Sequence, residues 1–403
     1  THDHTYLDII KQKYTKGDYM SANQDIQYLL TKYNNTSLKE LFIADLYISY
    51  DNICNALNNI NMYRNTLDDI VTNIHTYTSN TSFIQSLYTN YCLTLLTYQE
   101  YQHADTYLSV YNKIDNLDSE MSFFQEGDVN KTLFIYYMGG IGDLLMFARI
   151  IPELCSTYKH NTIKWMINFP NMKWLIDTVC NDIPNLVILY NNSIHETGHF
   201  DYHCNLHKVY SFLQYKTYDS IPFIPYLLNI NPEPTQKCTQ LIDTLTNTTK
   251  KNYIFNWSTN VQHSSNAAKR TMELQYAMSL FEVDNINWII TNKDISPQEY
   301  EILQKYNNII VLHDHLDTYD SESTFYDTMT ILKYIHGVIS TDTSLVHLSL
   351  TMDIPTYVLL DIGCDWRWGR QQMTKWYPNA HLIRQTTLRN WDTVIHTLLQ
   401  IIQ

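Results

Sequence analysis

The chain begins with a long stretch in which apolar side chains recur every three or four residues. From residue 1 to about 125 the pattern is that of amphipathic helices. The spacing is clearest in the stretch 38–62, where one face carries Leu41, Ala44, Leu46, Ile48, Ile53, Ala56 and Leu57. The pattern predicts an all-α domain over residues 1–128.

Two segments of this helical part resemble each other. Gly17-Asp18-Tyr19 leads to Ala22, and Gln99-Glu100-Tyr101 leads to Ala104. An aromatic residue followed three positions later by alanine is typical of the second helix of a tetratricopeptide repeat, because alanine lets two helices approach closely. We therefore expect an irregular TPR-like domain, and an unrelated helical bundle remains the alternative.

The hydrophobic pattern changes after the polar, turn-rich segment 126–130. The apolar run 132–137 is typical of a buried parallel strand. It leads into the glycine-rich segment 138–143 and then into an amphipathic stretch over 144–158. Strand, glycine loop and helix follow one another here, and further strand-like runs follow at 163–167 and 186–190.

A second alternating block predicts strands at 253–257, 286–290, 309–312, 337–340 and 356–360. A cluster of prolines separates the two blocks and marks a linker: Pro222, Pro225, Pro232 and Pro234. We expect an α/β fold with two Rossmann-like lobes, 129–232 and 233–403. Ligands of such sheets bind beyond the carboxyl ends of the strands, here in the cleft between the lobes.

Composition narrows the class of protein. The net charge is -14, from 27 basic and 41 acidic side chains, which argues against extended binding to nucleic acid or to anionic membrane. No apolar run reaches the roughly 18 residues of a membrane span. The seven cysteines form no C-x-x-C pair, so neither a disulfide framework nor a zinc site is expected. Reduced thiols and a start that does not resemble a signal peptide predict a cytoplasmic protein.

Glycine is scarce, and three of the nine glycines are Gly139, Gly140 and Gly142. Such a loop permits a tight turn and close approach of the backbone to a ligand. Asp143 follows in the first helical turn. Its carboxylate is favoured there by capping and the helix dipole, and it could equally serve as a general base on an acceptor hydroxyl.

Asp342, Thr343 and Ser344 follow a predicted strand and are good N-cap residues. The N–H groups of a helix that begins there would suit a diphosphate. His347 lies one turn along the same face and is either a structural residue or part of that anion site.

Lys269 and Arg270 form an adjacent pair of cations after the strand that ends at Trp257. They would neutralise a diphosphate leaving group, unless they are simply a solvated surface pair. The aromatic segments 365–370 and 376–378 would either stack on a base or sugar, or pack as a lid or interface.

In this order the motifs resemble glycosyltransferase family 9, the heptosyltransferase-like GT-B enzymes. More closely, they resemble bacterial proteins that join tetratricopeptide repeats to such a domain. The resemblance covers roughly residues 131–400. It is carried by GGIGDLLMFARIIPEL (139–154), FDYHCNLHKV (200–209), IPFIPYL (221–227), STDTSLVHLSLTMDIPTYVLL (340–360), DWRWGR (365–370) and WYPNAHLIRQ (376–385).

The resemblance implies an inverting, metal-independent glycosyltransferase without a cofactor, whose co-substrate is an ADP-, UDP- or GDP-linked hexose or heptose. Asp143 matches the proposed general base. Thr343, Ser344 and His347 match the residues that hold the donor diphosphate, and Lys269 or Arg270 matches the cation that pairs with it. Asp342 matches an acidic residue that is structural or contacts the sugar.

Two other functions compete with this one: a non-catalytic TPR/GT-B scaffold, and a viral-type enzyme that glycosylates nucleic-acid bases. Repeat domains present concave surfaces to extended partners, which favours a protein or glycan acceptor. The sequence does not choose between a monomer and a homo-oligomer.

Overall fold

The computed structural model describes residues 8–10, 12–13, 18–33, 68, 71–72, 81–108, 121–136, 139–190, 197–213, 215–259, 270–312, 316–317, 323–387 and 389–403. They belong to two compact units. One holds the described residues of 1–113 together with Asp361–Arg370 and Thr386–Asn390. The other holds those of 114–360, Gln371–Gln385 and Trp391–Gln403.

The first unit is helical in its N-terminal part. It contains α2 (Tyr19–Tyr33), α5 (Thr81–Thr97) and α6 (Tyr101–Leu108). Ala22 and Ala104 are fully buried, and the Cys92 thiol lies 3.6 Å from the Ala104 carbonyl oxygen, so α5 and α6 pack closely where the small side chain is. The TPR-like assignment remains a prediction, since Gly17 and the stretch 38–62 lie outside the described residues.

The segment 365–370 belongs to the same unit. Its short helix η6 (Trp366–Trp368) packs against α5, and both tryptophans are buried. The Asp365 carboxylate accepts a hydrogen bond from the Arg367 N–H at 3.3 Å and so caps η6. These contacts agree with the second of the two alternatives for this aromatic segment, that it packs against the protein rather than stacking on a base or sugar.

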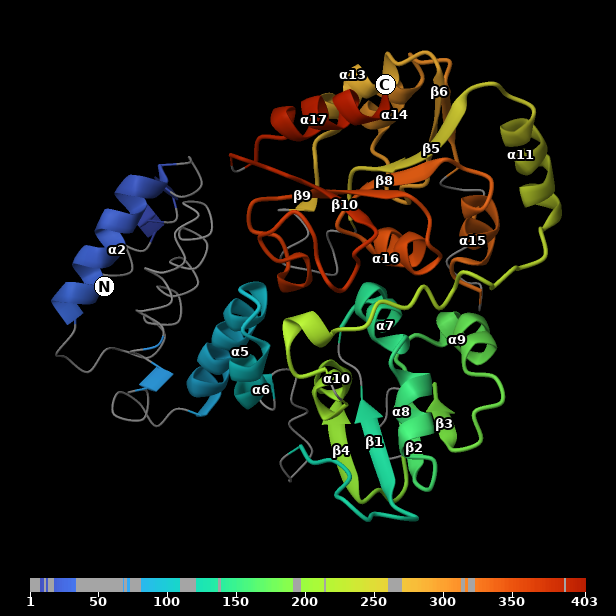
Figure 1. The fold of residues 1–403 in the computed structure, drawn as a ribbon. Helices are drawn as coiled ribbons and strands as arrows, with labels where there is room; N and C mark the ends of the chain where they lie inside the picture. The colour runs from blue at the N-terminus through green and yellow to red at the C-terminus, as the bar shows by residue number, and fades with distance from the viewer. Residues whose placement is uncertain are drawn as a thin grey trace. The chain divides into compact units, whose positions relative to one another are not determined.

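The second unit contains two parallel sheets, which confirms the predicted α/β fold (Figure 1). The first has the order β3-β2-β1-β4, with bounds β1 Thr132–Tyr136, β2 Thr162–Met166, β3 Leu186–Leu189 and β4 Tyr202–Asn205. Four consecutive β1 residues, 133–136, are buried, as expected of a strand covered on both faces.

The second sheet has the order β10-β9-β8-β5-β6-β7. Its strands are β5 Lys251–Asn256, β6 Ile286–Ile290, β7 Ile309–Val311, β8 Gly337–Thr341, β9 Thr356–Leu360 and β10 Ala380–Arg384. This is the order of a doubly wound Rossmann sheet, in which the chain reverses direction across the sheet between β5 and β8. Asn256 and Ser340 are partners in register at that point, so the ligand-binding position of such a sheet lies at their carboxyl ends.

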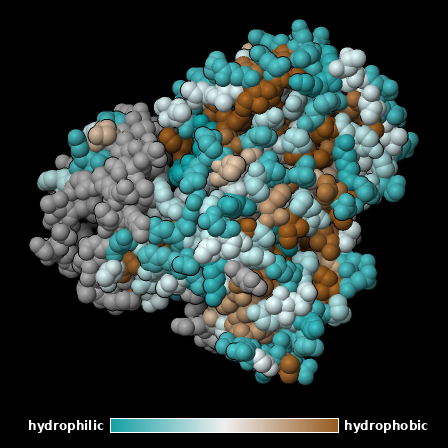
Figure 2. Space-filling model, in the orientation of Figure 1, coloured by the Kyte–Doolittle hydropathy of each residue, from teal (hydrophilic) through white to brown (hydrophobic). Residues whose placement is uncertain are grey.

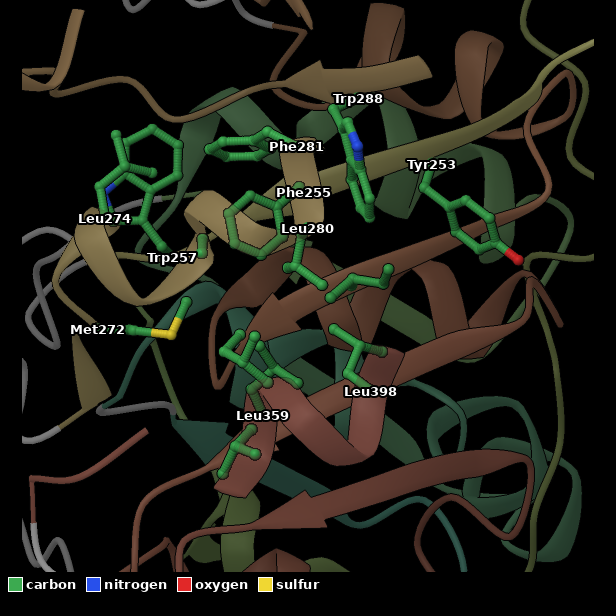
Figure 3. Close-up of a cluster of buried hydrophobic side chains, with 14 of the residues drawn as sticks. Tyr253, Phe255, Trp257, Met272, Leu274, Leu280, Phe281, Trp288, Leu359 and Leu398 are labelled. Atoms are coloured by element: carbon green, nitrogen blue, oxygen red, sulfur yellow. The ribbon is translucent and has the colours of Figure 1, made fainter. Parts of the chain in front are cut away.

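The core around the second sheet is rich in aromatic rings (Figure 3). Phe255 contacts Phe281 and Trp288 edge to face, with centroids 5.7 and 6.0 Å apart. Edge-to-face pairs of this kind stabilise a core beyond the area that they bury. The surface in Figure 2 mixes hydrophilic and hydrophobic residues.

Helices flank the two sheets. They are α7 Ile141–Ala148, α8 Ile151–Thr157, α9 Lys173–Val179, α10 Val209–Phe212, α11 Gln236–Thr246, α13 Met278–Phe281, α14 Pro297–Leu303, α15 Tyr326–Leu332, α16 Ser344–Thr351 and α17 Asp392–Ile402. None of the described helices is long and apolar enough to cross a membrane.

The two sheets are joined through α7 and α16, which pack against each other (Figure 1). The linker contacts both helices. The Tyr226 hydroxyl donates to the Leu145 carbonyl at 2.9 Å, and the Leu227 N–H donates to the Thr351 carbonyl at 3.1 Å. The α7–α16 pair therefore holds the glycine loop beside the segment that follows β8.

Candidate functional site

The glycine loop connects β1 to α7. Gly139 and Gly140 are exposed, and α7 begins at Ile141 with Gly140 as its N-cap. The Gly140 N–H donates to the Asp143 carboxylate at 3.2 Å, so Asp143 caps the first turn of the helix. This is the capping role expected for a carboxylate there. A role of Asp143 as a base remains a prediction.

Gly142 brings α7 against His347. A Cβ atom placed on Gly142 would lie 2.6 Å from Cδ2 and 3.1 Å from Nε2 of the imidazole. A Cβ contact of 2.6 Å is essentially never found in proteins, so any larger residue would displace the ring or the helix. Glycine is required here by the close approach of the two helices.

The segment after β8 forms the start of α16 at the carboxyl edge of the second sheet. Thr343 is the N-cap, and Ser344 is the first helical residue. Both are half-buried, and the Thr343 hydroxyl lies 3.1 Å from the Ser340 hydroxyl. The predicted helix start is therefore present, with its first N–H groups next to the switch point of the sheet.

Asp342 lies between a guanidinium and an imidazole. Its carboxylate accepts from Nη1 of Arg270 at 3.4 Å, and its other oxygen lies 3.9 Å from Nε2 of His347. Asp342 and His347 are each 2% exposed, whereas the Arg270 side chain is 22% exposed. Asp342 thus holds Arg270 beside His347, while Lys269 lies outside the described residues.

Sequence reasoning assigned no role to Arg149. It placed Tyr377 only within the aromatic segment 376–378, which would stack on a base or sugar or pack as a lid or interface. Both residues lie at this site. The Tyr377 hydroxyl is 2.8 Å from Nδ1 of His347, and the Arg149 guanidinium lies over the Tyr377 ring, 4.6 Å from its centroid. The signal in the sequence was an arginine within an apolar helical run, Met146 to Ile151. A charge at such a position needs a buried partner.

A second polar group that sequence reasoning missed lies at the ends of β5 and β6. The buried Asn292 amide donates to Asn256 at 3.0 Å and to the Ser258 hydroxyl at 2.8 Å. Because Asn256 is in register with Ser340, these amides occupy the same carboxyl edge as the start of α16. That edge is polar from β6 to β8.

Within the described part of the chain, no three His, Cys, Asp or Glu side chains come together as metal ligands would. The site consists of a glycine loop, a helix start, two guanidinium groups, one imidazole, one phenol and two carboxylates. Such a set can bind an anion and can move a proton.

No protein-family model and no curated protein matches this sequence. Among solved structures, a glycosyl transferase of family 9 from Veillonella parvula is 11% identical over 64% of this chain and 86% of its own, with a TM-score of 0.39. ADP-heptose lps heptosyltransferase II of E. coli is 11% identical over 68% and 100%, with a TM-score of 0.40. An O-GlcNAc transferase mutant from Thermobaculum terrenum is 10% identical over 100% and 90%, with a TM-score of 0.35. TM-scores this low establish no shared fold, so the site is interpreted from its own geometry.

Proposed function

We propose that this chain is an inverting, metal-independent glycosyltransferase of GT-B type. It moves a hexose or heptose from an ADP-, UDP- or GDP-linked donor to a hydroxyl of a protein or glycan acceptor. The observation that carries the proposal is the contact of Gly142 with His347. That contact brings together the glycine loop, the helix start and Arg270, three motifs that are far apart in the sequence.

The donor diphosphate lies at the start of α16 in this proposal. The first N–H groups of the helix and the Thr343 and Ser344 hydroxyls bind its oxygens, as helix N-termini bind phosphate. Arg270, kept in place by Asp342, neutralises the charge that develops on the diphosphate as it leaves. His347 supplies a further donor beside it.

Asp143 acts on the acceptor. Its carboxylate removes the proton of the acceptor hydroxyl, whose oxygen attacks the anomeric carbon from the face opposite the departing diphosphate, so the configuration inverts. In the absence of acceptor the carboxylate caps α7 through the Gly140 N–H. A capping bond to an exposed amide can be exchanged for a bond to a hydroxyl at small cost.

The experiment is a panel of nucleotide sugars incubated with the protein in EDTA. We expect release of a nucleoside diphosphate from at least one donor, with the sugar product formed first in the anomeric configuration opposite to that of the donor. Proton NMR of the early product distinguishes the two anomers. No turnover of any donor, with or without added divalent cation, would contradict the proposal.

A further inference from the structure

His347 has its imidazole fixed from the side of Nδ1. That nitrogen lies 2.8 Å from the Tyr377 hydroxyl, and the other ring nitrogen, Nε2, faces Gly142 and Asp342. Tyr377 is fully buried and His347 nearly so. Which nitrogen of a neutral imidazole carries the proton is set by the bond that the other nitrogen makes.

Tyr377 is itself fixed by Arg149. The guanidinium lies over the Tyr377 ring and donates to the Trp376 carbonyl through Nη1 and to the Met146 carbonyl through Nε, each at 2.7 Å. Arg149 is 2% exposed, and no carboxylate in the described part of the chain pairs with it. Moving the buried Arg149 guanidinium away from these carbonyls and from the ring face would cost free energy. The Tyr377 ring beneath it is therefore held in one position.

We propose that Tyr377 is a positioning residue that keeps the proton of neutral His347 on Nε2. The hydroxyl donates to Nδ1, so Nε2 carries the N–H and points it toward the glycine loop and Asp342. In the opposite tautomer Nδ1 would donate to the phenol oxygen, and Nε2 would present a lone pair that repels phosphate oxygens. The Asp342 carboxylate, 3.9 Å from Nε2, also favours an N–H there.

The consequence for donor binding depends on the proposed function, whereas the tautomer does not. With the proton on Nε2, His347 donates to the diphosphate without having to be charged. Tyr377→Phe keeps the ring under Arg149 and removes the hydroxyl alone. Tyr226→Phe is the matched control, since it removes a hydroxyl that donates to the Leu145 carbonyl at the same inter-helix contact, and not the hydroxyl that bonds to His347.

The test measures the ring nitrogen-15 shifts of His347, assigned by their loss in His347→Gln, and the Kd of ADP, UDP and GDP by calorimetry. We expect Nε2–H in the wild type and in Tyr226→Phe, and a mixture of tautomers in Tyr377→Phe. We also expect the affinity for the preferred nucleotide to fall about tenfold in Tyr377→Phe alone, equivalent to about 1.4 kcal/mol.

A wild-type imidazole with its proton on Nδ1, or nitrogen shifts that Tyr377→Phe leaves unchanged, would overturn the positioning role. A changed tautomer with an unchanged Kd would overturn its link to donor binding. If the wild type binds none of the three nucleotides, the proposed function fails, and the nitrogen shifts still decide the positioning role.

Discussion

Gly142 and His347 meet where α7 packs on α16, with only 2.6 Å between the position of a Cβ on residue 142 and Cδ2 of the imidazole. The glycine loop therefore has a second purpose besides turning the chain toward a ligand. It makes room for His347 of α16, the helix that follows β8 of the other sheet and lies about two hundred residues later in the chain.

Replacing Gly142 should damage this contact. Gly142→Ala forces the imidazole or α7 to move, and we expect a loss of about 1–3 kcal/mol in the free energy of unfolding, the usual cost of overpacking. Nucleotide binding should weaken in parallel. Gly140→Ala is the stability control, because its Cβ would meet nothing within 4 Å. Equal midpoints in chemical denaturation for the two variants would contradict the contact.

Arg270 should contribute more to the binding of nucleoside diphosphates than other cations of the same lobe do. Arg270→Ala removes the guanidinium beside the Asp342 carboxylate, and we expect the affinity for nucleoside diphosphates to fall about tenfold or more, as charge-assisted phosphate contacts do. Lys305→Ala, which removes an exposed cation just after α14, should leave the affinity unchanged. Calorimetry at low and at physiological salt checks both, and equal losses in the two variants would indicate a non-specific charge effect.

Much of the second unit could be predicted from the sequence. Continuous apolar runs predicted β1 and the strands β5 to β9 of the second sheet, because a strand buried on both faces leaves little room for polar residues. The sixth strand of that sheet, β10, was not predicted. The start of α16 followed from three consecutive capping residues, Asp342 to Ser344. These are local signals, each readable within a few positions.

The roles of Tyr377 and Arg149 could not be predicted, because they depend on contacts between distant segments. Arg149 bonds to the carbonyl of residue 376, and Tyr377 bonds to His347 on a different element. The hydrophobic pattern of the sequence predicts that each segment is buried, but it does not predict which segments contact each other. The close approach of His347 to Gly142 could not be predicted from the sequence for the same reason.

Trp376 should be a main support of the aromatic cluster that it forms with Phe147 of α7 and Tyr210 of α10. It is fully buried and contacts Phe147 and Tyr210 edge to face, with centroids 5.4 and 5.5 Å apart. Trp376→Ala should cost about 3–5 kcal/mol of unfolding free energy, through lost burial and the cavity left behind. Trp174→Ala, at a half-buried tryptophan, is the comparison. An unfolding midpoint for Trp376→Ala no lower than that of Trp174→Ala would show that the cluster is unimportant.

The buried thiols predict a dependence on alkaline pH. Burial raises the pKa of Cys155 and of Cys180 to about 12. Because the folded-state pKa exceeds the ordinary value of about 8.5, the stability that these thiols contribute is complete below that pH and declines as the pH rises toward 12. At pH 8 iodoacetamide should modify both cysteines roughly a thousandfold more slowly in the folded than in the unfolded protein. Mass spectrometry of the two peptides checks this, and comparable rates would contradict it.

The central claim is that Asp143 is the base of a sugar transfer, and the most direct measurement compares donor turnover by the wild type and by Asp143→Asn. Asparagine keeps an oxygen that can cap α7 through the Gly140 N–H, but it cannot accept a proton. We predict that Asp143→Asn lowers the rate about 10²–10⁴-fold while the Kd for the nucleoside diphosphate stays the same and the free energy of unfolding falls by no more than about 1 kcal/mol, the contribution of a charge at a helix start. Unchanged turnover in Asp143→Asn would contradict the claim and leave Asp143 as a helix cap.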